Sequence, residues 1–249
     1  MSLVLSSLGT LYTALGVFAA MLVPLALLAA TPRRQRRDLR LTLGVAAFVA
    51  LWFAVAGSLA TAGAFQTAVG GVPTIAFAVA IPIALGLGAV WLIEPVGRAF
   101  AMPDLQPLLI AMQSYRIFGL GFVVLMVLGQ LPAIFAIPAG LGDFAIGLTA
   151  FGAASAARDG QLSRAVWWNV MGLVDLGVAL TLGVGTGPSQ LGFIPTMPRN
   201  TLFSLAPFAI VPSFFVPLDI TLHVLSLRGL LARRAQSAAN QPLPQLAAA

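Results

Sequence analysis

The sequence contains no cysteine and no lysine, and these absences remove several kinds of chemistry. Without cysteine, the chain forms no disulfide, no thiolate metal site and no thiol nucleophile. Without lysine, it forms no Schiff base, so a retinal cofactor is excluded. Its one histidine, His223, rules out bis-histidine haem and multi-histidine metal centres. We therefore expect neither a cofactor nor a metal site.

Charged residues are also scarce. Of 249 residues, 59% are hydrophobic and 8% are charged, whereas about one quarter of the residues in soluble proteins are charged. So little charge cannot cover a water-facing surface, and so apolar a chain is not disordered. The net charge of +6 does not indicate nucleic-acid binding in such a chain. We predict an all-α, polytopic integral membrane protein.

Seven segments are apolar and long enough to cross the roughly 30 Å of a bilayer core as helices. They are 8–30, 41–62, 74–93, 107–129, 132–157, 165–185 and 202–227. The sequence thus predicts a bundle of seven transmembrane helices in a single domain, 1–234. The polar, Pro- and Ala-rich remainder, 235–249, is predicted to be a flexible tail.

The arginines predict the orientation of the chain, because basic residues concentrate in cytoplasmic loops. Eleven of the thirteen lie on one side of the predicted bundle: Arg33, Arg34, Arg36, Arg37, Arg40, Arg98, Arg158, Arg164, Arg228, Arg233 and Arg234. Arg199 lies on the other side, and Arg116 lies within a span. We expect an outside N-terminus and a cytoplasmic C-terminus, in the inner membrane of a bacterial-type cell.

Polar residues within the spans are candidates for function, because a charge in hydrocarbon is costly unless it is paired or hydrated. The candidates for binding a ligand or ion are Gln113, Arg116, Asp143, Asn169, Asp175, Asp219 and His223. Helical periodicity turns these side chains toward the bundle interior. We expect a polar centre between the fourth and seventh helices.

One buried arginine faces up to three buried aspartates in this centre. Arg116 can neutralise one of them, and Asp219 can pair with a protonated His223 one helical turn away. The third carboxylate must then be protonated, hydrated or matched by a cation. The alternative is structural, with an Arg116–Asp175 pair that locks two helices together.

Two sequence patterns accompany these residues. The segment 140–149, which begins Gly-Leu-Gly-Asp and ends Leu-Thr, resembles the segment 172–181, which begins Gly-Leu-Val-Asp and ends Leu-Thr. Their spacing is one span plus its linker, as in the inverted repeats of transporters. In the seventh span, Pro212 and Pro217 free the carbonyls of Phe208 and Ser213, which could coordinate an ion.

These features favour a transporter-like or permease-like protein for a small solute or ion that exchanges a proton or cation. One alternative is a non-catalytic subunit, receptor or assembly factor that binds a partner protein through its lipid-facing helices or its tail. Another is a lipid-modifying membrane enzyme that uses Asp219 and His223 as an acid–base pair. The remaining expected partners are the lipid bilayer and the solute, proton or cation.

Overall fold

The computed structural model describes residues 2–30 and 39–239, and all regular elements in these ranges are helical. Seven helices of the described chain are long and apolar enough to span a membrane, as predicted. They are α1 (Ser2–Ala30), α2 (Leu39–Thr61), α3 (Thr74–Leu92), the series α5 (Leu105–Met112), η2 (Gln113–Gly119) and α6 (Leu120–Val127), α7 (Ala133–Arg158), α8 (Leu162–Gly185), and the series η4 (Val211–Phe215) and α9 (Val216–Ala239).

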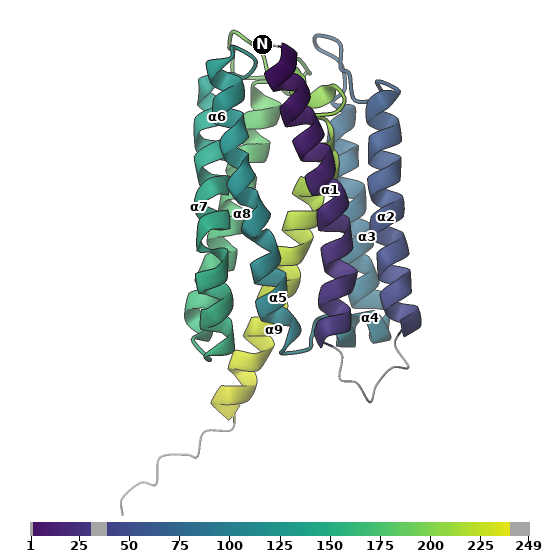
Figure 1. Cartoon of the computed structure of the whole chain (residues 1–249), viewed down its shortest axis with the longest axis vertical. Helices are drawn as coiled ribbons and strands as arrows, with labels where there is room; N and C mark the ends of the chain where they lie inside the picture. The colour runs from purple at the N-terminus through teal and green to yellow at the C-terminus, as the bar shows by residue number, and fades with distance from the viewer. Residues whose placement is uncertain (1, 31–38, 240–249) are drawn as a thin grey trace, which may run out of the picture.

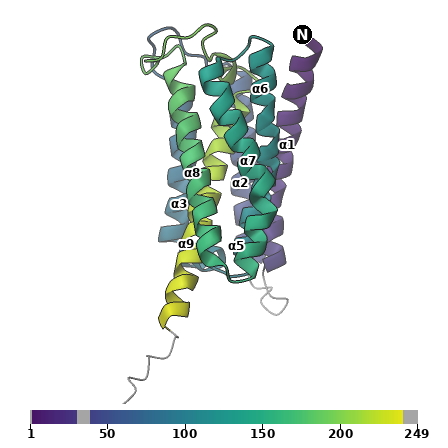
Figure 2. The same cartoon turned by 90° about the vertical axis from the view of Figure 1, so that its left-hand side faces the viewer.

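The spanning helices stand side by side and alternate in direction along the chain (Figure 1). α9 lies centrally and packs against α3, α5 and α8, while α7 packs against the fourth span and α8. The view in Figure 2 shows α7 and α8 in front of this central helix. A further short helix, α4 (Glu94–Phe100), follows α3 in the linker before the fourth span.

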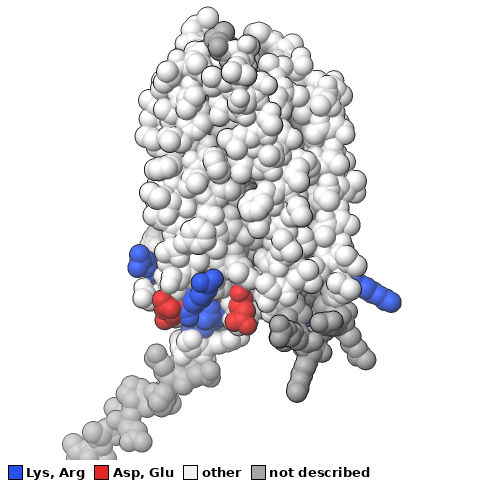
Figure 3. All heavy atoms as spheres, in the orientation of Figure 1, with Lys and Arg blue, Asp and Glu red and all other residues white. Residues whose placement is uncertain are grey.

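Charge distinguishes the two ends of the bundle. Among the described residues, seven predicted cytoplasmic arginines lie at one end, named here the arginine-rich end: Arg40, Arg98, Arg158, Arg164, Arg228, Arg233 and Arg234. Arg33, Arg34, Arg36 and Arg37 lie outside the described residues. The charged side chains on the face in Figure 3 gather at this end. Arg199, in the loop between α8 and η4, lies at the opposite end.

The seventh span begins later than predicted. Its expected start falls on η3 (Leu202–Ser204), a single 3-10 turn, and the chain then runs irregularly until the helix begins at Val211. Pro212 lies in the first turn of this helix. A proline is tolerated there because the amide of a first-turn residue has no partner within the helix.

The seventh span also ends later than predicted. α9 continues to Ala239, beyond the expected end at 227. The first residues of the predicted flexible tail, 235–239, are therefore helical, and residues 240–249 lie outside the described residues.

The carbonyls freed by prolines in the seventh span already have partners. The Trp52 indole nitrogen, on α2, donates to the Ser213 carbonyl at 2.9 Å. The Phe208 carbonyl accepts the Val211 amide at 3.0 Å. Each of these oxygens thus accepts a hydrogen bond that holds the start of the seventh span.

Glycines let α7 approach the fourth span unusually closely. A Cβ atom on Gly147 would lie 2.9 Å from the Arg116 carbonyl carbon and would overlap the Ile117 amide nitrogen. A Cβ atom on Gly140 would lie 2.9 Å from the Gly119 carbonyl oxygen. Backbone cannot yield as a flexible side chain does, so this contact requires glycine. Small residues bring membrane helices together in this way.

We expect Gly147→Ala to separate α7 from η2 and to destabilise the protein by about 1–3 kcal/mol, the usual cost of overpacking. The matched control is Gly152→Ala on the same helix, where a Cβ atom meets nothing within 4 Å. Thermal unfolding in mild detergent measures both variants. Equal unfolding temperatures for the two would contradict the close approach.

Candidate functional site

Arg116 is buried at the centre of the bundle, on the 3-10 segment η2 in the middle of the fourth span. A 3-10 helix has three residues per turn, so Gln113, Arg116 and Gly119 lie on one face. The Arg116 side chain is only 1% exposed. A guanidinium so placed needs charged or hydrogen-bonding partners, because burial removes its water.

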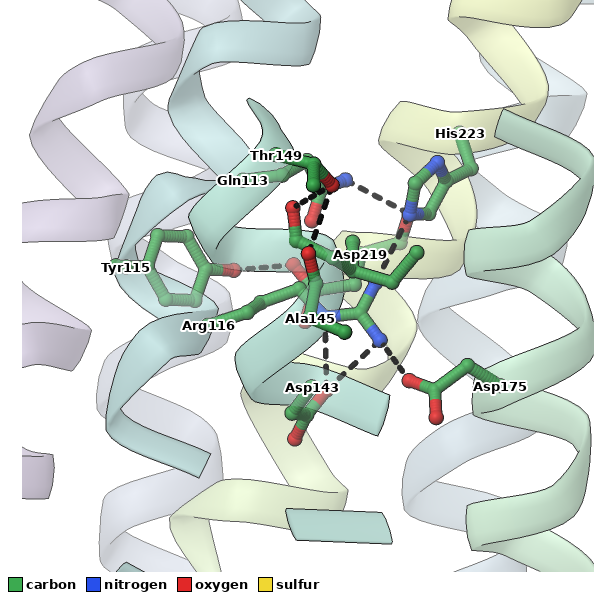
Figure 4. A network of polar contacts seen from close by, with 10 residues as sticks. Gln113, Tyr115, Arg116, Asp143, Ala145, Thr149, Asp175, Asp219 and His223 are labelled. Atoms are coloured by element: carbon green, nitrogen blue, oxygen red, sulfur yellow. Dashed lines mark hydrogen bonds and ion pairs between the residues drawn. The ribbon is translucent and has the colours of Figure 1, made fainter. Parts of the chain in front are cut away.

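Two aspartates from different helices bind this guanidinium (Figure 4). Its Nε donates to Asp143 Oδ1 on α7 at 2.8 Å, and Nη2 lies 2.7 Å from the same oxygen. Nη2 also donates to Asp175 Oδ2 on α8 at 2.5 Å. The planar fork of an arginine suits such a bridge, whereas a lysine would offer a single point charge. Arg116 was predicted to pair with one aspartate, and in the structure it pairs with two.

The two aspartates are the fourth residues of the two similar segments, 140–149 and 172–181. α7 and α8 are antiparallel neighbours, and each carries its aspartate to the same arginine. Glycines make room for this arrangement: a Cβ atom on Gly142 would overlap the Asp175 carboxylate, and one on Gly172 would overlap the His223 ring.

His223 completes the surroundings of Arg116. Arg116 Nη1 lies 2.9 Å from His223 Nε2, and His223 Nδ1 lies 3.0 Å from Asn169 Oδ1. A guanidinium only donates, so Nε2 must accept and Nδ1 must carry the proton given to Asn169. Asn169 Nδ2 in turn donates to Ser226 Oγ at 3.1 Å and to the Ala165 carbonyl at 2.9 Å. The geometry therefore describes a neutral imidazole.

The predicted pairing of Asp219 with a protonated His223 is wrong. Although Asp219 and His223 lie one turn apart on α9, His223 Nε2 already accepts a hydrogen bond from the Arg116 guanidinium. Asp219 Oδ1 instead accepts the hydroxyl of Tyr115, which projects from η2. Gln113 Nε2 donates to the Asp219 backbone carbonyl at 3.4 Å. Figure 4 shows Tyr115 and Gln113 approaching Asp219 from the fourth span.

The seven predicted site residues therefore divide into two adjoining groups. Arg116 gathers Asp143, Asp175, His223 and, through the histidine, Asn169. Tyr115 and Gln113 hold Asp219. With one guanidinium, three carboxylates and a neutral imidazole, the centre has an excess of negative groups whenever the aspartates are ionised.

Cavities adjoin this centre. One of them, named here the main cavity, has a volume of about 340 Å³ between α3, α7, α8 and η4. Its polar residues are Thr67, Ser189, Asn200 and Ser204 near the opposite end, and Asp143 and Asp219 near the middle of the bundle. A small cavity of about 30 Å³ adjoins Tyr12, Tyr115, Arg116, Asp143 and Asp219, which is room for a water molecule.

Asp143 and Asp219 are thus the two candidates that face both cavities. Gln113, Asn169, Asp175 and His223 line neither of them. A further cavity of about 360 Å³ lies between α2, α3 and α9, and Arg40 is the one charged residue of its described lining. Asp219 and His223 do not line it.

Tyrosine, asparagine and phenylalanine residues at this site were not predicted from the sequence. The tyrosines are Tyr115, beside Arg116, and Tyr12, whose hydroxyl donates to the Phe118 carbonyl at 3.1 Å. A tyrosine in an apolar span is a signal that could have found both. Asn200 and the phenylalanines of the main cavity were missed because a loop asparagine and apolar aromatic residues carry no distinguishing pattern.

No group of three or more His, Cys, Asp or Glu side chains is placed to hold a metal ion within residues 2–30 and 39–239. Two of the three aspartates of the centre instead bind the Arg116 guanidinium.

The family model for a domain of unknown function, DUF8737, matches residues 72–231. The matched region begins just before α3 and ends within α9, so it includes Arg116 and all of its partners. No curated protein and no solved structure matches the chain.

We expect Arg116→Leu to destabilise the protein by about 3–5 kcal/mol, because it leaves buried carboxylates without their counter-charge. The triple variant that adds Asp143→Asn and Asp175→Asn should recover part of this loss. The control is Arg98→Leu, whose pair with Glu94 is exposed (68% and 78%) and is worth about 0–1 kcal/mol. Denaturant or thermal unfolding in detergent measures all three, and equal losses for the two single variants would contradict a central role for Arg116.

Proposed function

The chain belongs to the family of the domain of unknown function DUF8737, and we propose that it is a transporter-like or permease-like membrane protein for a small solute or ion. The observation that carries the proposal is the position of Asp143 and Asp219, which line a cavity of about 340 Å³ and also border the Arg116 centre. Carboxylates at that boundary can exchange a bound proton for a cation from the cavity.

The distribution of arginine supports an orientation for this transport. Basic residues favour the cytoplasmic side, so we infer that the arginine-rich end faces the cytoplasm of a cell with an inner membrane. The main cavity then extends from the external loops, which carry Ser189 and Asn200, to the two aspartates in the middle of the bundle. It is an access route from outside.

Two irregular segments border the aspartates and could change between open and closed forms. η2 is a 3-10 segment that carries Tyr115 and Arg116, and η4 is a π-helix just before Asp219. Such segments in a spanning helix are common at functional positions and at hinges. We propose that they rearrange when Asp143 or Asp219 changes its charge.

A lipid-modifying enzyme that uses Asp219 and His223 has less support. Both ring nitrogens of His223 are engaged, and the ring lines none of the three cavities described above. Asp219 makes its hydrogen bond with Tyr115 instead. Asp219 alone of this acid–base pair faces a cavity, so a substrate there would not meet His223.

We expect Asp143→Asn and Asp219→Asn to abolish cation-coupled proton movement while leaving the protein folded, because each amide keeps the shape but loses the exchangeable charge. Proteoliposomes that enclose a pH-sensitive dye are given a Na⁺, K⁺ or tetraalkylammonium salt on the outside, because these cations have no membrane-permeant free base, and the internal pH is followed. Asp159→Asn, an exposed acid after α7, is the control and should behave as the native protein does. Proton movement in both cavity variants equal to that of the native protein would refute the proposal.

A further inference from the structure

One wall of the main cavity is aromatic. Phe122, Phe135 and Phe203 come from α6, α7 and η3, and their ring centroids lie 5.2–5.9 Å apart. Phe215 of η4 adds a fourth ring, 5.4 Å from Tyr115. All four phenylalanines line the cavity. The faces of aromatic rings carry negative potential, so such a wall attracts a positively charged group as well as an apolar one.

The charged groups of the same cavity are both acidic. Asp143 and Asp219 lie on its described lining, whereas no arginine or histidine does. Arg116 touches the small cavity but not this one. A ligand in the main cavity therefore meets two acidic side chains, Asp143, which is paired with Arg116, and Asp219, which accepts only a neutral hydroxyl, so an anionic ligand is disfavoured there.

Asn200 gives an independent indication that a ligand binds. It is 6% exposed and lines the cavity, and its Nδ2 donates to the Gly183 carbonyl at 3.3 Å. Its Oδ1 is buried without a hydrogen-bond partner. A buried acceptor without a donor costs about 1–3 kcal/mol, so an N–H or O–H group from an occupant is favoured at this place.

We infer that the ligand of the main cavity is an organic cation with an apolar body, such as an aryl or alkyl ammonium. The inference rests on the proposed function and names its substrate class. The positive group binds at Asp143 and Asp219, and the apolar part lies against the phenylalanines. A cavity of about 340 Å³ is within the range of small-molecule sites. A bare inorganic ion would leave most of this apolar volume unfilled.

The test is direct binding of benzyltrimethylammonium to the full chain in lipid nanodiscs, by equilibrium dialysis of the radiolabelled salt. This quaternary cation has no N–H group for Asn200, so the test addresses the acidic and aromatic contacts alone. Benzenesulfonate should not compete, and neopentylbenzene, the neutral molecule of the same shape, should compete at least tenfold more weakly than the unlabelled cation. Binding should weaken as the pH falls, because protons compete for the carboxylates. Equal competition by the neutral molecule would overturn the inference.

Variants separate the two parts of the site. Asp219→Asn, which still accepts the Tyr115 hydroxyl, should weaken binding at least tenfold. Phe135→Leu keeps an apolar side chain but removes a ring face, and should weaken binding about two- to thirtyfold. The matched controls are Asp159→Asn and Phe151→Leu. Phe151 is an exposed side chain on α7 and Asp159 is an exposed side chain directly after it, so both variants should bind the cation as the native protein does.

The outcomes distinguish the inference from the proposed function. If benzyltrimethylammonium does not bind but Na⁺ or K⁺ drives proton movement that depends on Asp143 and Asp219, the inference is wrong and the proposed function stands. If the native protein neither binds the organic cation nor moves protons with any cation tested, both are wrong. Loss of binding in Asp219→Asn but not in Asp159→Asn supports the inference.

Discussion

The structure depends on the burial of one guanidinium. Arg116 lies among seven apolar helices with its side chain 1% exposed, a position that is tolerable only if the protein replaces its hydration shell. Carboxylates from two neighbouring helices and an imidazole from a third do so. The glycines on α7 and α8 follow from the same requirement, because larger residues would keep these partners away. One charge thus sets the spacing of four spans.

Much of this architecture could be predicted from the sequence. Long apolar runs and short linkers predict the seven spans, and polar residues in apolar runs identify the members of the centre. The pairing of these residues could not be predicted in the same way. Helical periodicity suggested that Asp219 joins His223, but the 3-10 geometry of η2 brings Tyr115 to Asp219 and Arg116 to His223. Local periodicity cannot reveal which neighbouring helix supplies the nearest partner.

The segment before α9 shows a different limit. Its apolar residues and prolines resemble a continuous kinked helix, yet the chain reaches Val211 through irregular structure that places Phe203 and Asn200 at the main cavity. The freed Ser213 carbonyl is satisfied by Trp52, which lies 161 residues away in the sequence. The predicted consequence of the proline was correct in that a carbonyl lost its helical donor. Its partner was set by tertiary packing between α2 and η4.

The double anchoring of Arg116 also bears on how a cation could act at this site. Asp143 both binds Arg116 and lines the main cavity, whereas Asp175 binds Arg116 but lines neither cavity described at the centre. A cation that draws Asp143 toward the cavity would remove one partner of the guanidinium and leave the other. Arg116 would then keep Asp175 as its counter-charge, so the costly intermediate of a buried guanidinium with no acidic partner is avoided. An arginine with two acidic partners, of which one faces the cavity, can therefore hold the helices together and also respond to a cation in the cavity.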